Sequence, residues 1–276
     1  MVKNLQNIGE SLCNATPLKG WKKFKIKMVV LFGTILNGNK MISKEILKNC
    51  LFFDVETAGC APDYSTLQKE NPRLAKLFNR RYKYYQGMAE FQNSSIDEVF
   101  LGKAGLEPEY AKVVCVSFGT IFVDTDGIEK PRLVTFYGEN EKEILEKSNK
   151  VFSNASAKGM KLCGHNIKGF DVPCLGKRML YNSIEPSKIL SIWDKKPWEV
   201  PYLDTSEIFA FGSWSQQKYL SLDLLACSLG VDSPKEDIDG SQVHKTFWSD
   251  RDFEKIKIYC EKDVETVMSV LDKVSH

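Results

Sequence analysis

Hydrophobic and polar residues follow two different spacings along this chain, and the change of spacing marks where strands give way to helices. Short apolar runs rich in β-branched and aromatic residues predict three successive strands, at Cys50–Thr57, Val113–Val123 and Arg132–Tyr137. The stretch Asp124-Thr125-Asp126-Gly127 is typical of a hairpin turn, so the second and third strands should pair with each other. The pattern therefore predicts an antiparallel meander.

After the meander, apolar residues recur at helical spacing, interrupted by one strand-like run at Met160–Cys163. The predicted helices lie at Glu141–Phe152, Val172–Tyr181, Thr205–Phe211, Leu222–Leu229 and Asp252–Val274. This order predicts an α/β fold of the ribonuclease H-like kind. Its mixed sheet combines the antiparallel meander with parallel strands, and helices cover both faces.

The chain divides unevenly. Residues 1–48 are rich in lysine and asparagine without clear periodicity, and our hypothesis is that they form a poorly ordered N-terminal appendage, with Met41 as an alternative start. Residues 49–276 are predicted to form the functional domain. The segment 61–111, between the first two strands, is too long for a bare loop and should be a helical insertion containing a helix at Pro72–Gln86.

Composition narrows the class of protein. The chain has 38 Lys and Arg against 36 Asp and Glu, so it does not bind nucleic acid through bulk charge, and a polyanion must meet a local patch or bound metal ions. Its 8 cysteines show no zinc-binding or redox spacing. The longest apolar stretch, Met28–Leu36, is far shorter than the ~20 residues that span a bilayer, and no signal-peptide cleavage site follows it. We expect a cytoplasmic protein without a membrane partner.

The first candidate site lies in the first strand. Because side chains alternate along a strand, Asp54 and Glu56 share one face, where two adjacent carboxylates can bind a divalent cation. The alternative is a solvated strand end. The same spacing occurs at Asp252 and Glu254, which we interpret as an ordinary helix surface.

A second candidate follows the strand at Met160–Cys163. A turn containing His165 and Asn166 leads to Asp171 at a predicted helix start. In isolation, an N-cap role is favoured over a metal-ligand role as the explanation of Asp171. His165 is interpreted as a hydrogen-bonded turn residue rather than a metal ligand.

A third candidate lies on the last helix. Tyr259 and Asp263 are four residues apart and share a face, beside an apolar stripe formed by Ile256, Cys260, Val264, Val267 and Leu271. A carboxylate bordering the core is unfavourable without a partner. Tyr219 and Asp223 have the same spacing, but Asp223 is explained as a favourable first-turn acid.

Taken in chain order, these three motifs resemble the exonuclease motifs of the DEDD superfamily, in its tyrosine-bearing (DEDDy) subclass. More narrowly, the chain resembles the predicted 3′ to 5′ exonucleases related to the proofreading domain of family B DNA polymerases, over about residues 49–274. Ile258 stands where the histidine-bearing subclass has histidine. The supporting segments are LFFDVET, LCGHNIKGFDVPCL, KKPWEVPYLDT, SLDLLACSLG, SPKEDIDGSQV and YCEKDVETV.

The resemblance implies a two-metal-ion exonuclease that hydrolyses single-stranded or frayed 3′ ends of DNA. Two divalent cations, Mg²⁺ or Mn²⁺, would be held by four acids, with Tyr259 orienting the attacking water. Thr57 and Asn166 are candidates for holding the terminal nucleotide, and Phe170 is either a stacking wedge or a buried aromatic. The implied metal ligands are Asp54, Glu56, Asp171 and Asp263.

Two other functions stay open at this point. One is a 3′ to 5′ exoribonuclease, and the other is a catalytically silent nucleic-acid-binding module. In the insertion, cations interleaved with rings fit either a single-strand-binding surface or a plain amphipathic covering helix. These residues are Arg73, Lys76, Phe78, Arg80, Arg81, Tyr82, Lys83, Tyr84 and Tyr85.

Overall fold

The computed structural model describes residues 42–212, 220–232 and 238–275. The chain separates into one unit of residues 1–43 and 275–276 and a second unit of residues 44–274, to which the following description applies. The predicted appendage lies largely outside the described residues, as does Met41. Of that segment, residues 44–48 belong to the second unit, where they form helix α3 (Lys44–Lys48) and bury Leu47.

One five-stranded sheet organises the fold, in the order β3-β2-β1-β4-β5. The strands β1, β2 and β3 pair antiparallel, whereas β4 runs parallel to β1 and β5 runs parallel to β4. This confirms the mixed, ribonuclease H-like sheet. The strands are β1 (Cys50–Gly59), β2 (Ala111–Val123), β3 (Glu129–Tyr137), β4 (Lys161–Gly164) and β5 (Leu203–Asp204).

The β2–β3 hairpin is longer than the sequence predicted. The strand β3 begins at Glu129, which pairs with Val123, because the Asp124 carboxylate accepts the backbone N–H of Ile128 and closes the turn. Pro131 is tolerated there because β3 is an edge strand. Exposed polar residues at the start of β3 gave no alternating pattern from which to predict this part of the strand.

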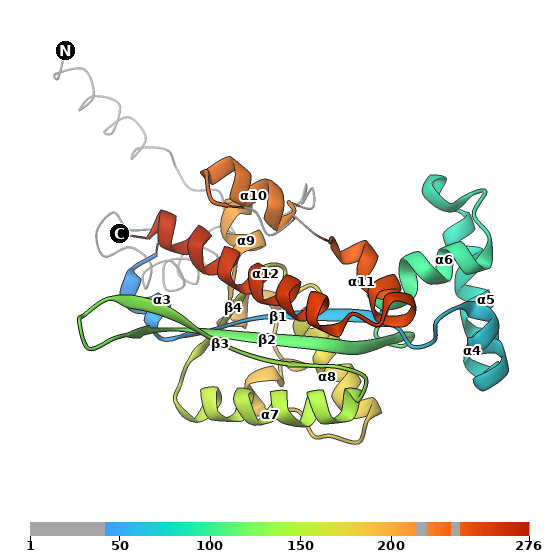
Figure 1. Ribbon diagram of the computed structural model, residues 1–276, viewed down its shortest axis with the longest axis horizontal. Coiled ribbons are helices and arrows are strands. Elements are labelled where there is room, and N and C mark those ends of the chain that lie inside the picture. The colour runs from blue at the N-terminus through green and yellow to red at the C-terminus, as the bar shows by residue number, and fades with distance from the viewer. Residues whose placement is uncertain (1–41, 213–219, 233–237, 276) are drawn as a thin grey trace, which may run out of the picture. The chain divides into compact units, whose positions relative to one another are not determined.

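Helices cover both faces of the sheet (Figure 1). The helices α7 (Glu141–Ala157) and α8 (Asp171–Tyr181) lie on one face and α12 (Phe253–Val274) lies on the other. Odd-numbered residues of β1 such as Phe53 pack against α7, where the Phe53 and Phe152 rings meet at 5.2 Å. Even-numbered residues of β1 therefore face α12.

The helix α12 packs directly against Gly119 of β2, where a side chain would collide with it. A Cβ atom at Gly119 would lie 2.7 Å from Val264 Cγ1, which no ordinary packing tolerates. Two hydrogen bonds then fix the rotation of α12 beside β3: the Thr135 hydroxyl donates to Glu261 over 2.6 Å, and the Tyr137 hydroxyl donates to Glu254 over 2.7 Å. With α12 held in this rotation, the side of the helix that carries Tyr259 and Asp263 faces β1.

The insertion after β1 contains helices around an aromatic core in which Phe78 contacts Phe100 and Tyr110. Its helix α5 spans Pro72–Gln86, which confirms the predicted bounds. The insertion is attached to β1 by the Thr57 hydroxyl, which donates to the Gly105 carbonyl over 2.6 Å. The other elements of the insertion are α4 (Tyr64–Glu70), η1 (Ala89–Phe91), α6 (Ile96–Lys103) and η2 (Ala104–Leu106).

The remaining helices are short and surround the sheet and α12. They are η3 (Lys188–Leu190), η4 (Pro197–Glu199), α9 (Thr205–Ala210), α10 (Leu222–Leu229), η5 (Gly240–Gln242), α11 (Val243–Lys245) and the π-helical turn η6 (Thr246–Asp250). Among the described segments, no helix combines the length and the apolar character needed to cross a membrane.

Candidate active site

Three of the predicted acids meet between β1 and α12. Asp54 and Glu56 lie on the even-numbered face of β1, and Asp263 lies on the facing helix. One ligand oxygen from each carboxylate lies within 4.8 Å of the other two. Residues more than 200 positions apart thus form a group with the dimensions of a cation site, which we call the carboxylate cluster.

Asp171 lies beside the carboxylate cluster but outside this group of three. Its side chain is 4% exposed at the start of α8, and its charge raises the pKa of Asp54. The N-cap interpretation of Asp171 is wrong, because Asp171 is the first residue of the helix and Phe170 is the N-cap, without a side-chain cap bond. A capping role therefore does not explain why this acid is buried.

Burial opposes the ionisation of Asp54, Glu56 and the neighbouring Asp171. It raises the pKa of Asp54 to about 8, with the charge of Asp171 acting in the same direction. Burial also raises the pKa of Asp171 to about 8, although its own backbone N–H acts in the opposite direction. Burial and the charges of Asp54 and Asp263 raise the pKa of Glu56 well above its ordinary value. Without a counter-charge, these acids resist becoming carboxylates together.

The donor set fits a hard divalent cation. Carboxylate oxygens are ligands that Mg²⁺ and Mn²⁺ prefer. Within the described ranges, no lysine or arginine forms an ion pair with Asp54, Glu56 or Asp171. The Cys260 thiol donates to Asp54 Oδ2 over 3.4 Å, but burial raises the pKa of that thiol, which keeps it a neutral donor. A divalent cation would therefore supply the positive charge that these acids need to ionise together.

Tyr259 borders the carboxylate cluster from the same helix as Asp263. Its side chain is 8% exposed, and burial followed by the charge of Glu56 raises its pKa far above the ordinary value. The hydroxyl group thus stays protonated at neutral pH. Tyr259 is suited to orient a ligand by hydrogen bonding and unsuited to remove a proton.

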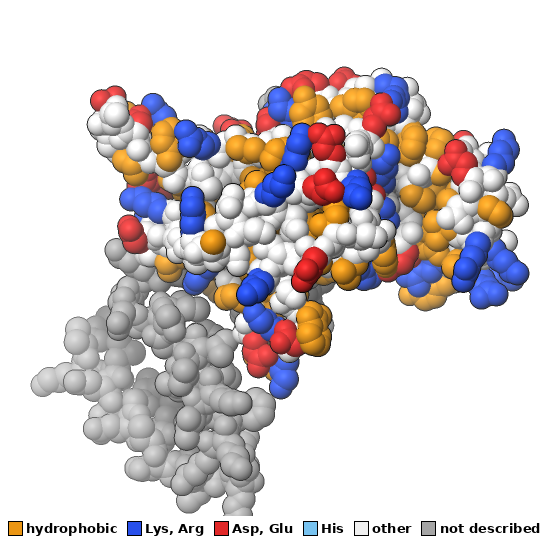
Figure 2. Space-filling view, turned by 90° about the horizontal axis from the view of Figure 1, so that it is seen from below, with side chains coloured by type: hydrophobic (Ala, Val, Ile, Leu, Met, Phe, Trp, Pro, Cys, Tyr) orange, Lys and Arg blue, Asp and Glu red, His pale blue; other side chains and the backbone are white. Residues whose placement is uncertain are grey.

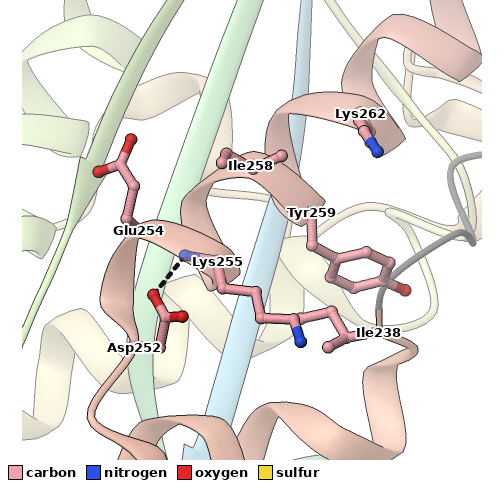
Figure 3. A pocket seen from close by; sticks show the side chains of 7 residues that line it. All are labelled: Ile238, Asp252, Glu254, Lys255, Ile258, Tyr259 and Lys262. Carbon is pink, nitrogen blue, oxygen red and sulfur yellow. Dashed lines mark hydrogen bonds between the residues drawn. The ribbon is translucent and has the colours of Figure 1, made fainter.

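A groove of about 370 Å³ opens along the first turns of α12, on the outer side of Tyr259. Figure 3 shows the Tyr259 ring and the Lys255 side chain extending toward Ile238. The remaining lining residues are Asp252, Glu254, Ile258 and Lys262. Asp252 accepts the backbone N–H of Lys255, which confirms the interpretation of Asp252 and Glu254 as helix surface rather than a second cation site.

The turn from β4 to α8 is organised by Asp204, a residue that the sequence analysis did not single out. The Asp204 side chain is 2% exposed and accepts the backbone N–H groups of Asn166, Lys168 and Ser206 over 2.8–3.0 Å. Its charge also raises the pKa of Asp171. Its position directly before a predicted helix is a sequence signal for an N-cap, which Asp204 is, but not for its bonds to Asn166 and Lys168.

His165 holds the same turn and is not a metal ligand. Its Nδ1 lies 2.8 Å from the Thr205 hydroxyl, and its Nε2 lies 2.7 Å from the Leu220 carbonyl. Because a carbonyl only accepts, Nε2 carries the proton and Nδ1 accepts from Thr205. This confirms the prediction of a hydrogen-bonded turn residue.

The three predicted substrate-binding residues have different surroundings. The Thr57 hydroxyl is already bonded to Gly105, which leaves only its acceptor capacity for a ligand. Asn166 adopts a left-handed backbone with a φ of 56° in the turn. Phe170 is partly buried and packs against the main core, while its stacking role stays a prediction.

A family model matches residues 106–273, which is well over half of the chain. The chain belongs to the family described as "Predicted 3'-5' exonuclease related to the exonuclease domain of PolB". The matched range contains Asp171, Tyr259 and Asp263, whereas Asp54 and Glu56 precede it. Strand β1, which carries those two acids, lies in the sheet between β2 and β4, and both of these strands belong to the matched range.

Among solved structures, the chain is similar to the family B DNA polymerase from the hyperthermophilic archaeon Pyrobaculum calidifontis. The two share 17% identity at a TM-score of 0.44, over 82% of this chain. This chain covers 24% of the polymerase chain. A search of curated proteins finds no match.

Proposed function

We propose that this protein is a metal-dependent 3′ to 5′ exonuclease that removes nucleotides from single-stranded or frayed 3′ ends of DNA. The observation that carries the proposal is the carboxylate cluster, in which Asp54, Glu56 and Asp263 bring ligand oxygens within 4.8 Å of one another. Family membership supports the reaction class.

In this proposal, Asp54, Glu56, Asp171 and Asp263 would hold two divalent cations, Mg²⁺ or Mn²⁺. When bound, such ions would supply a nucleophilic water at neutral pH and would neutralise charge on the departing 3′ oxygen. Water attacks the terminal phosphodiester, the bond from phosphorus to the 3′ oxygen breaks, and a nucleoside 5′-monophosphate leaves. Four carboxylates supply four negative charges, which match the charge of two divalent ions.

The chain's own residues have distinct roles in this reaction. Protonated Tyr259 orients the attacking water by hydrogen bonding, because its raised pKa prevents it from acting as the base. Thr57 and Asn166 contact the terminal nucleotide, and Phe170 separates it from its neighbour. The cluster is partly open at Asp54 and Asp263, which admits the strand end.

The direct test is digestion of a 5′-labelled single-stranded DNA in Mn²⁺ or Mg²⁺, with EDTA as the control. A ladder shortened from the 3′ end is expected, and chelator should abolish it. Activity that persists in EDTA would contradict the two-metal proposal. Retardation of the DNA without shortening would identify a silent binding module, and faster digestion of a matched RNA would reassign the substrate to RNA.

A further inference from the structure

The helix α5 has a charge composition unlike that of the other long helices. Its sequence, PRLAKLFNRRYKYYQ, contains five lysines and arginines and no acid. By contrast, α7 carries three glutamates and three lysines, and α12 carries five acids and four lysines. Since the whole chain has a formal charge of only +2, the cations of α5 are a local concentration of positive charge.

The structure resolves the two interpretations that the sequence left open for these residues. The inner face of α5 buries Ala75, Phe78 and Tyr85 in the core of the insertion, so the helix does cover a core. The outer face exposes a cationic row, which we call the α5 stripe. It consists of Arg73, Lys76, Arg80 and Lys83. These positions recur every three or four residues, about 4.5–6 Å apart along the helix axis, and form one continuous row.

The cations of the α5 stripe have no acidic partner among the described residues. Arg81, the fifth cation of the helix, differs because Glu107 holds it at 2.9 Å. Arg81 in turn lies 4.8 Å from the centroid of the Tyr84 ring. The Arg81 contact positions Tyr84, which stays 56% exposed beside the stripe. Leu77, on the same helix, is 44% exposed.

The α5 stripe belongs to the segment that directly continues the strand of the carboxylate cluster. The strand β1 carries Glu56 and ends at Gly59, and the insertion begins immediately afterwards. The Thr57 hydroxyl bonds Gly105 at the far end of the insertion, which ties both of its ends to this strand. Figure 1 shows α4, α5 and α6 beyond the end of β1, and Figure 2 shows lysine and arginine side chains gathered over that end.

We propose that the α5 stripe, with Tyr84 and Leu77, binds the phosphodiester backbone of the single strand whose 3′ end lies in the carboxylate cluster. This inference rests on the proposed function for the identity of the strand. Regularly spaced cations match a row of phosphates, and an exposed ring beside them offers a stacking surface for a base. Nucleotides upstream of the reacting end then add affinity without taking part in the chemistry.

The test neutralises three cations together in the full chain, as Lys76→Gln/Arg80→Gln/Lys83→Gln. The matched control removes three exposed lysines from the mixed-charge helix α7 and its C-cap, as Lys142→Gln/Lys150→Gln/Lys158→Gln. Fluorescence anisotropy measures binding of labelled oligothymidine of about 5 and about 30 nucleotides across a range of salt concentrations. Circular dichroism checks the folding of both variants, and we expect both to fold because all six side chains are exposed.

We expect the α5 variant to bind the long strand at least tenfold more weakly, with the salt slope reduced by about 2, as loss of three phosphate contacts requires. Its affinity for the short strand and its rate of digesting that strand should equal those of wild type. Tyr84→Ala should weaken binding of the long strand about fivefold or more by removing a stacking surface. The α7 control should bind both strands as wild type does.

Unchanged long-strand affinity in the α5 variant would overturn the inference, as would an equal loss in the α7 control. Competition by poly-glutamate as effective as that by oligothymidine would also overturn it, because the surface would then bind any polyanion. The binding assay is independent of catalysis. Absence of nuclease activity in the wild type would contradict the proposed function, while a reduced salt slope in the α5 variant would still support nucleic-acid binding by the stripe.

Discussion

Two acidic centres, one at Asp204 and one at the carboxylate cluster, lie near the same end of the sheet, and their surroundings are opposite. Asp204 is surrounded by donors: three backbone N–H groups and the Ser206 hydroxyl point at its carboxylate. In the carboxylate cluster, Asp54 and Glu56 face other acids, and burial raises the pKa of both. The comparison separates an acid whose negative charge the chain satisfies from acids that need an external positive charge.

The largest expected effect is on catalysis. Asp54→Ala removes one ligand of the carboxylate cluster and should lower the exonuclease rate by about a thousandfold or more, equivalent to about 4 kcal/mol of transition-state stabilisation. Initial rates on a labelled single strand measure it. The matched control is Glu146→Ala, which removes an exposed acid from α7, on the opposite face of the sheet. A near-wild-type rate for Asp54→Ala would mean that another acid holds the ions.

The next effect is on stability, and its sign should differ between the two centres. In EDTA at about pH 8, Asp54→Asn should raise the melting temperature, because it removes a charge whose formation burial disfavours. Asp204→Ala should lower the melting temperature by several degrees, because it leaves buried N–H groups without an acceptor. Differential scanning fluorimetry measures both variants. Equal destabilisation by the two changes would show that Asp54 and Asp204 do not differ in how well the chain stabilises their charge.

A smaller loss is expected at Tyr259. Tyr259→Phe should lower kcat by about 10- to 100-fold through poorer positioning of the attacking water. The thermal stabilisation by Mg²⁺ should not change, since no metal ligand is lost. Comparing kcat with the Mg²⁺-induced shift in Tm tests both statements. Loss of that shift in the variant would assign Tyr259 to metal binding instead.

The smallest effect is the pH dependence of the metal-free protein. The pKa of Asp54 and of Asp171 is about 8 in the folded state, against an ordinary value of 3.8. A raised pKa contributes stability that is complete below the unfolded value and is lost as the pH rises through the folded one. In EDTA, the melting temperature should therefore fall between about pH 4 and pH 8, less steeply in Asp54→Asn than in wild type. A melting temperature that rises over this window would contradict the raised pKa values.

Local signals in the sequence predicted several elements closely. The bounds of α5 were predicted because Asn71 accepts the Leu74 N–H as a cap and Pro72 occupies the first turn. Similarly, α10 lies at its predicted residues because Ser221 caps its start and Gly230, with a φ of 66°, ends it. Where capping groups lie within a few residues of the helix, sequence alone is sufficient.

Features that depend on distant partners were not predictable in the same way. Asp204 acts on Asn166, which lies 38 positions away, so no local pattern revealed its role. Asp171 looked like a capping residue because a turn precedes it, but the hydrogen bonds that shape the turn come from Asp204 and leave Phe170 as the N-cap. The motifs identified the acids of the carboxylate cluster, whereas their meeting depends on Gly119 allowing α12 close to the sheet.

The central claim is that the carboxylate cluster holds divalent cations. Isothermal titration of Mn²⁺ into the metal-free protein tests it most directly, with Asp54→Asn and Asp263→Asn titrated alongside. The account predicts saturable binding of two ions per wild-type chain and loss of binding in both variants. Absence of binding by the folded wild-type protein at millimolar Mn²⁺, or wild-type binding by both variants, would contradict it.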